Sequence, residues 1–367
     1  VMFGMNDVGR HLYAPEKSGP GTEAARADRA AAFETSMREL ARRLLDAGAR
    51  VILVQPSPFD DTARLELPDL PGCGAALAGY AATVRRLAAE LGVATIDFNG
   101  PMTDLNRRRQ AYDPAFTLVG RDRVHPGKPG HLVMAYLFLR AQDEPGLVSA
   151  VHIDASAGRL SKAEGAVVAD LEASPASVAF DITEAALPFP VDPESAPALG
   201  LVPFSEALNR QILRVAGLAP GRHRLAIDDE PVGEFDAEAL ARGVNLADLP
   251  HTPQLRQARA ARAALARKWE AEGGLRSIAY SEHFAWPDAP RPLDLAAMRA
   301  RVEARIAATG SSNSWVAAQH RACLELKPRE PELAAQAESA LAEARAIARP
   351  RPHRSALAPA RASAPRP

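Results

Sequence analysis

The sequence predicts an α/β domain built on a parallel sheet, followed by a small β-rich module and a helical C-terminal region. Three observations carry this prediction. Strand-like and helix-like stretches alternate over residues 1–146, short runs of alternating apolar and polar residues fill 147–236, and helical periodicity marks 237–348. The tail 349–367 is rich in Arg and Pro and has no acidic residue, so it is predicted to be disordered.

The N-terminal part contains three strand candidates. The apolar residues 1–3 are typical of the end of a buried strand, and 51–54 and 93–98 are apolar runs of the kind that parallel sheets bury. Helices are expected between them, because apolar residues recur at helical spacing. The residues in this pattern are Phe33, Met37, Leu40 and Leu44 for the first helix, and Leu77, Tyr80, Val84, Leu87 and Leu91 for the second.

A long polar loop is predicted after residue 98, and a closing helix over 128–141. Beyond it, 178–182 reads as a strand and 222–235 as a hairpin. Thr252-Pro253 is a typical helix start.

The composition excludes several classes of protein. The chain has 367 residues, 44 basic and 45 acidic, and a net charge of −1, which gives no electrostatic reason to expect nucleic acid as a partner. The two cysteines, Cys73 and Cys323, have no metal-ligand spacing. No apolar run is long enough for a membrane span. We therefore expect no metal, no cofactor, no nucleic acid and no membrane span.

Asp122 and His125 are the first candidates for chemistry. A carboxylate three residues before a histidine can bind the Nδ1 of its ring, fix the tautomer and leave Nε2 free as a general base. Pro126 restricts the backbone of His125. Taken alone, the short motif is more typical of a surface loop with an incidental Asp and His.

Asn6 is the second candidate, in the loop Gly4-Met5-Asn6-Asp7 after the first strand candidate. An amide at the carboxyl end of a parallel sheet can donate its N–H to a developing oxyanion. Gly4 permits the tight turn that would bring it there. The alternative is an ordinary Asn-Asp turn closed by side-chain hydrogen bonds.

Together, the Gly4–Asp7 loop, two strand–helix units and the Asp122-Arg123-Val124-His125-Pro126 block resemble the SGNH (GDSL-like) hydrolases over roughly residues 1–145. The resemblance implies a flavodoxin-like three-layer α/β/α fold and ester hydrolysis by a Ser-His-Asp triad. It implies that His125 and Asp122 belong to the triad, that Asn6 is an oxyanion-hole donor and that Gly4 shapes its loop. The region after 147 resembles an extension of some bacterial members.

The family's Ser and Gly blocks have no counterpart in this sequence. The resemblance therefore implies that residues 1–3 correspond to the third strand, that the nucleophilic serine lies upstream, and that this chain alone is truncated and nearly inactive. An apolar sheet edge is also expected to be exposed at 1–3. Within the chain, Ser57 is the best substitute for the nucleophile, although it has no glycine beside it to form a tight elbow.

The substrate is left open. An ester of a small molecule or a carbohydrate is expected, with an O-acetylated sugar as one case, and the resemblance implies export of the complete protein. The alternative is a non-catalytic remnant that serves as a binding module.

Overall fold

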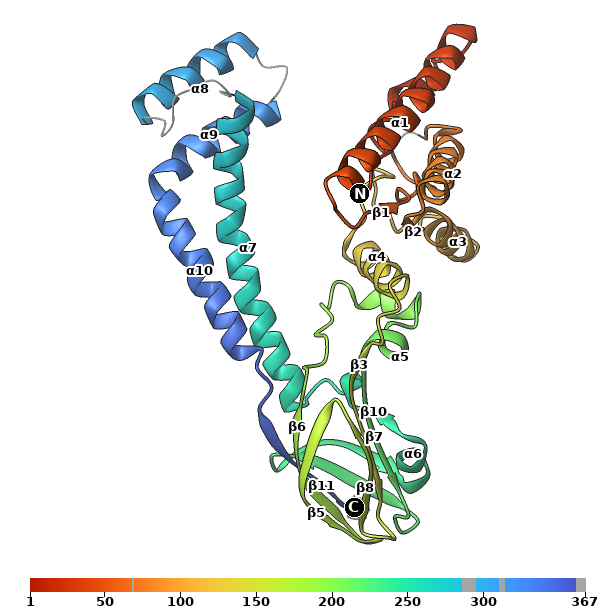
Figure 1. The fold of residues 1–367 in the computed structure, drawn as a ribbon, viewed down its shortest axis with the longest axis vertical. Helices are drawn as coiled ribbons and strands as arrows, with labels where there is room; N and C mark the ends of the chain where they lie inside the picture. Colours follow the sequence, from red (N-terminus) through yellow and green to blue (C-terminus); the bar gives the residue numbers. More distant parts are fainter. Residues whose placement is uncertain (68, 286–294, 310–313, 361–367) are drawn as a thin grey trace, which may run out of the picture. The chain divides into compact units, whose positions relative to one another are not determined.

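The computed structural model describes residues 1–67, 69–285, 295–309, 314–360, and it divides into two compact units (Figure 1). The first unit contains residues 1–146 together with 191–208, and the second contains 147–190 and 209–367. The sequence placed the boundary at 146 but did not predict that 191–208 would pack with the first unit.

The sheet of the first unit is short and parallel. Strand β1 (Ile52–Val54) pairs with β2 (Ala94–Ile96), and Met2 adds a single parallel bridge to Val54. The backbone N–H of Val54 also donates to the carbonyl of Val1 over 2.8 Å. Residues 1–3 therefore lie beside β1, joined to it by this bridge and by the backbone hydrogen bonds of Val1.

Two hydrophobic clusters cover the two faces of this sheet. Leu53 packs with α1 (Pro20–Asp46) and α2 (Cys73–Leu91). The neighbouring Val54 points to the opposite face and packs with α3 (Asn99–Gln110) and α4 (Lys128–Arg140). This alternation follows from the two-residue period of a strand. The result is the three-layer α/β/α arrangement that the resemblance implied.

Helix α3 corrects the prediction of a long polar loop after residue 98. Its sequence contains Gly100, Pro101 and three consecutive arginines, so the apolar period is weak. Met102, Leu105 and Asn106 are nevertheless buried. Tertiary packing therefore determines this helix more than its own sequence pattern does.

The segment 191–208 carries η2 (Ala196–Gly200) and α5 (Phe204–Leu208). Ala198, Val202 and Phe204 join the cluster on the α4 side of the sheet. The Arg109 guanidinium donates to the carbonyl of Gly200 over 2.7 Å. A short 3₁₀ helix, η1 (Arg10–Tyr13), precedes α1.

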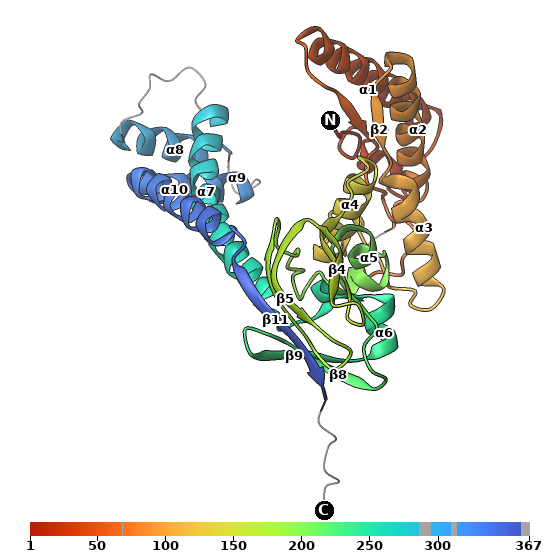
Figure 2. The same cartoon turned by 60° about the horizontal axis from the view of Figure 1, so that its bottom comes forward.

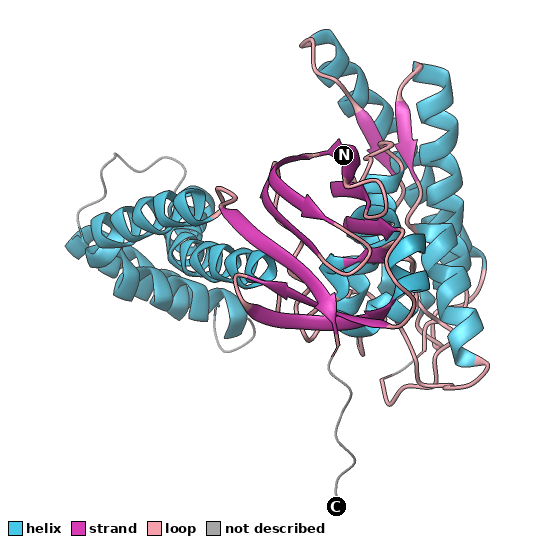
Figure 3. Cartoon of the chain, turned by 90° about the horizontal axis from the view of Figure 1, so that it is seen from below, coloured by secondary structure: helices cyan, strands magenta, loops and turns pink. Residues whose placement is uncertain are grey.

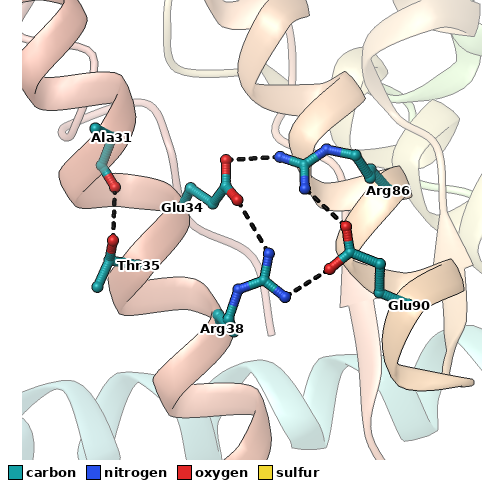
Figure 4. A network of polar contacts seen from close by, with 6 residues as sticks. All are labelled: Ala31, Glu34, Thr35, Arg38, Arg86 and Glu90. Atoms are coloured by element: carbon teal, nitrogen blue, oxygen red, sulfur yellow. Dashed lines mark hydrogen bonds and ion pairs between the residues drawn. The ribbon is translucent and has the colours of Figure 1, made fainter.

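A ring of four charged side chains joins α1 and α2 (Figure 4). Arg38 binds Glu34 and Glu90, and Arg86 binds the same two carboxylates, with N–O distances between 2.5 and 3.0 Å. These hydrogen bonds lower the pKa of both glutamates. Because the ring is exposed to solvent, salt screens it.

The second unit begins with two β-sheets, drawn in magenta in Figure 3. One has the strand order β10-β7-β3-β4 and the other β5-β6-β11-β8-β9. The cluster around Phe180, Leu225 and Leu357 fills the core with apolar residues of both sheets. The strands are β3 (Leu147–Asp154), β4 (Arg159–Glu164), β5 (Ala166–Ala173), β6 (Val178–Glu184), β7 (Arg210–Ala216), β8 (Arg222–Ile227), β9 (Glu230–Asp236), β10 (Val244–Asn245) and β11 (Pro352–Pro359).

Strand β11 corrects the prediction of a disordered tail. It lies in the middle of its sheet, between β6 and β8 (Figure 2). Ser355 and Leu357 are buried there. Its partners are distant in the sequence, so composition alone suggested disorder. Residues 361–367 of the predicted tail lie outside the described residues.

Helices form the rest of the second unit. Helix α7 (Pro253–Ala285) starts at the predicted Thr252-Pro253, where the Thr252 hydroxyl accepts a hydrogen bond from the N–H of Leu255 over 3.3 Å. A core around Ile278, Met298 and Cys323 joins α7 to the later helices. The other helices are α6 (Ala237–Arg242), η3 (Leu246–Asp248), α8 (Leu295–Thr309), α9 (Ser314–Leu326), η5 (Lys327–Arg329) and α10 (Glu330–Ile347). None of the helices in the described ranges has both the length and the apolar character of a membrane span.

Candidate functional site

The Asp122–His125 block forms a compact turn directly before α4. Asp122 Oδ1 accepts hydrogen bonds from the backbone N–H groups of Val124 (3.1 Å) and His125 (3.0 Å). The His125 ring nitrogen Nδ1 lies 2.5 Å from Asp122 Oδ2. The local backbone therefore holds the carboxylate, and the carboxylate holds the ring.

The protonation state of Asp122 supports this arrangement. Burial disfavours its charged form, but the hydrogen bonds from the His125 ring and from the two backbone N–H groups outweigh that effect, so the pKa of Asp122 is lowered. An ionised carboxylate only accepts hydrogen bonds, so Nδ1 of His125 is the donor of this bond and Nε2 is the ring nitrogen left for a reactant. The His125 side chain is 77% exposed, so the ring is accessible to a reactant.

The loop that carries Asn6 is a separate tight turn. The carboxylate of Asp7 accepts from the N–H of Gly4 over 2.9 Å, and the N–H of Val8 donates to the carbonyl of Gly4 over 3.0 Å. Gly4 has φ +129°, and a Cβ there would lie 3.1 Å from Pro56. Asp7, and not Asn6, closes the turn.

Asn6 is exposed, and in the described part of the chain its side chain has no hydrogen bond. It lines a pocket of about 390 Å³ together with Gly9, Arg10, His11 and Arg29. Its amide is therefore available to a ligand.

The two loops are anchored in one core, although no direct bond joins them. Met5 and Val8 from the first loop and Val124 from the second pack in the same hydrophobic cluster. Among the described residues, no hydrogen bond or ion pair connects Asn6 with Asp122 or His125. The structure thus brings Asp122 and His125 together and places Asn6 on a loop of the same core.

The serine candidates do not complete a triad within the described residues. Ser57 is 8% exposed, lies between two prolines and makes no hydrogen bond to His125. Ser149 donates to Glu184, and Ser156 to Asp154. No described serine donates to His125.

The sheet edge at residues 1–3 carries exposed apolar side chains. Met2 is 43% exposed and Phe3 is 53% exposed. Met2 is paired with Val54 on one side.

Sequence reasoning missed Arg123, which lies inside the Asp122–His125 block. It is 3% exposed, and its guanidinium donates to backbone carbonyls of the loop 60–67. The only hint in the sequence was a positively charged residue within the predicted loop. Its burial could not be predicted, because the carbonyls that it binds are distant in the sequence.

Comparisons with known proteins agree with the fold and with the family resemblance. Residues 1–133 match the model of the GDSL-like Lipase/Acylhydrolase family. A solved structure described as a gut microbial diltiazem-metabolizing enzyme is 28% identical, with a TM-score of 0.81, and the match covers 98% of this chain and 83% of that one. No curated protein matches the chain.

Two further solved structures are less similar. An acetyl xylan esterase is 21% identical with a TM-score of 0.29, and the match covers 38% of this chain and 64% of that one. An α/β hydrolase from the metagenome of Lake Arreo, Spain, is 26% identical with a TM-score of 0.27, and the match covers 39% of this chain and 58% of that one. These two scores carry no weight beside the family match, which shows that residues 1–133 form a GDSL-like lipase/acylhydrolase domain.

Proposed function

We propose that this protein is a serine ester hydrolase in which His125 is the general base, Asp122 orients it and Asn6 donates to the oxyanion. The observation that carries the proposal is the Asp122–His125 pair. Its Nδ1 is bound by the carboxylate at 2.5 Å, whereas the ring is 77% exposed and offers Nε2 to a reactant.

The mechanism moves one proton in each half of the reaction. A serine Oγ attacks the ester carbonyl carbon, and its proton passes to Nε2 of His125. The oxyanion of the tetrahedral intermediate accepts from the side-chain N–H of Asn6. As the C–O bond to the alcohol breaks, His125 returns the proton to the leaving oxygen. Water then releases the acyl group from the serine by the same sequence of steps.

We assign the nucleophile to a serine outside these 367 residues, on a segment that pairs with the free edge at 1–3. The exposed side chains of Met2 and Phe3 support this assignment, since a further strand would cover them. Ser57 is the alternative inside the chain, and its burial between two prolines argues against it.

The proposed substrate is a short-acyl ester of a small molecule, with an O-acetylated sugar as the specific case. The similar enzyme that metabolizes diltiazem supports a small organic substrate. The acyl pocket would lie where Asn6 and His125 face a bound ester.

Two experiments test the nucleophile and the function together. The first is to read the sequence encoded in frame before Val1 and to assay the protein that includes it on p-nitrophenyl acetate. We expect a strand that ends in a serine elbow, and turnover that His125→Ala abolishes. An in-frame stop codon directly before Val1, together with no turnover, would leave a non-catalytic binding module.

The second experiment treats the 367-residue chain with a fluorophosphonate, which labels activated serines, and maps the adduct by mass spectrometry. We expect no labelled serine. Labelling of Ser57, with turnover that Ser57→Ala abolishes, would refute the assignment to an outside serine and keep the hydrolase.

A further inference from the structure

The backbone of Arg123 adopts a conformation that arginine rarely takes. Its φ is +66°, in the left-handed region that favours glycine. It lies between Asp122 and His125, so this turn decides how the two side chains meet. A residue with a Cβ remains in such a conformation only where other contacts compensate for the strain.

Those contacts come from the loop 60–67. The Arg123 Nη1 donates to the carbonyls of Asp60 and Ala63, both over 2.9 Å, and Nη2 donates to the carbonyl of Leu67 over 3.2 Å. The carbonyl of Arg123 accepts from the N–H of Asp60 over 3.2 Å. One residue thus binds the loop through both its side chain and its backbone.

The guanidinium is buried without a carboxylate partner. Arg123 is 3% exposed, and across the described ranges no ion pair involves it. Backbone carbonyls therefore provide its electrostatic partners. A planar group with a fixed fork of donors suits several carbonyls at once, whereas a lysine ammonium is a single point charge.

The loop that Arg123 holds is one wall of a pocket of about 810 Å³. The other wall is the segment 115–121, which runs directly into Asp122. The N–H of Arg64 ties the two walls together by donating to the carbonyl of Pro114 over 2.8 Å. Four of the nine residues that line the pocket are apolar, and they come from both walls: Leu65, Leu67, Ala115 and Phe116. The other five are Arg64, Glu66, Thr117, Gly120 and Arg121.

We propose that Arg123 is a positioning residue that fixes this pocket wall relative to the Asp122–His125 pair, and that the pocket binds the apolar group of the ester. The proposal rests on the proposed function for its substrate and on the observed contacts for its mechanics. It adds a substrate class, an ester with an aryl or other apolar group, to the hydrolase assignment.

The test compares three variants of the full chain. Arg123→Gly removes the guanidinium and suits the left-handed backbone, so it does not introduce strain. Arg123→Lys keeps the charge and loses the fork. Arg50→Gly is the matched control, since Arg50 is exposed, lies outside the pocket and makes no hydrogen bond in the described structure.

The first readout is amide hydrogen exchange in the loop. The N–H groups of Thr62, Ala63 and Arg64 are all hydrogen-bonded in the structure. We expect Arg123→Gly to speed their exchange by tenfold or more, Arg123→Lys to have an intermediate effect, and Arg50→Gly to leave the rates unchanged. Unchanged rates in Arg123→Gly would overturn the proposal.

The second readout is the NMR titration of the Asp122 carboxyl carbon. If Arg123 positions the pair, Arg123→Gly moves the pKa of Asp122 upward, towards its ordinary value, as the hydrogen bonds to the carboxylate weaken. A loosened loop with an unmoved Asp122 would show that Arg123 only supports the loop, which also overturns the proposal. Should Arg123→Gly fail to fold, the same two readouts on Arg123→Lys decide.

The third readout is binding of acetanilide, an aryl amide that resembles an aryl ester. We expect its titration to shift the resonances of Leu67 and Phe116, and Arg123→Gly to weaken the affinity at least fivefold. Shifts confined to other residues would overturn the pocket assignment. None of these readouts needs turnover. A failure of the protein that includes the sequence before Val1 to hydrolyse esters would count against the proposed function and leave this inference to be decided by its own measurements.

Discussion

Two Asp–His pairs in this molecule have the same chemistry and different surroundings. In the first, Asp122 and His125 are three residues apart, and the ring is 77% exposed. In the second, Asp228 and His353 are 125 residues apart, the Nδ1–Oδ2 distance is 2.7 Å and the His353 side chain is 9% exposed. The second ring has a buried Nε2 without a hydrogen-bond partner.

The difference teaches which property makes such a pair a candidate for catalysis. The hydrogen bond to Nδ1 is common to both, so it cannot be the distinguishing feature. What differs is access to Nε2, which a reactant needs. The buried pair instead joins β11 to the turn between β8 and β9, because Asp228 also accepts from the N–H of Arg354 over 3.0 Å.

The largest expected effect separates the two histidines by activity. In the protein that includes the proposed upstream serine, His125→Ala should reduce the kcat of ester hydrolysis by about 10⁶-fold, because a triad loses its general base. His353→Ala should leave the kcat of the folded protein unchanged. Initial rates on p-nitrophenyl acetate measure both, and an equal loss in the two variants would show that access to Nε2 is not what distinguishes the pairs.

The two aspartates should differ in the same way as the two histidines: replacing Asp122 should lower kcat, and replacing Asp228 should not. Asp122→Asn should reduce kcat by about 10⁴-fold, because the amide no longer holds the required tautomer of the ring. Asp228→Asn is the matched control and should not change kcat. A small effect of Asp122→Asn in the same assay would mean that the backbone alone orients His125.

The two pairs also show which side-chain contacts could be predicted from the sequence and which could not. Asp122 and His125 were predictable because a hydrogen bond across three residues is local. Asp228 and His353 were not, since only the pairing of β11 with β8 brings them together. The role of Arg123 was hidden for the same reason, as its partners lie in the loop 60–67.

The fold follows the same division. The strands β1 and β2 and the helices α1, α2 and α4 were predicted from apolar periodicity within each element. Helix α3 and strand β11 were not, because packing against distant segments determines them. Local sequence patterns therefore predicted the strands and helices that carry the two site loops. Elements that depend on long-range contacts could not be predicted in this way.

The two histidines should affect stability in the opposite order: replacing His353 should destabilise the protein more than replacing His125. His353→Ala removes a buried ring and its hydrogen bond to Asp228, so we expect the free energy of unfolding to fall by about 1–3 kcal/mol. His125→Ala removes an exposed ring and should change it by no more than about 0.5 kcal/mol. Urea denaturation of the full chain measures both, and comparable losses would contradict the assignment of His353 to a structural role.

The smallest expected effect is on the pH dependence of stability. Burial raises the pKa of Asp228, but the hydrogen bonds from His353 and from the N–H of Arg354, with nearby positive charge, outweigh it and lower the pKa. A carboxyl whose folded-state pKa is depressed contributes stability above its unfolded-state pKa, about 3.9, and loses it as the pH falls through the folded value.

Asp228→Asn should therefore flatten the decline of the urea midpoint below pH 4 while leaving its shape above pH 5 unchanged. Asp122 also has a lowered pKa, yet Asp122→Asn should flatten the curve less, because its partners are adjacent in the chain and persist in part when the molecule unfolds. If Asp122→Asn had the larger effect, the local pair would be the structural one and the comparison between the two pairs would have to be reversed.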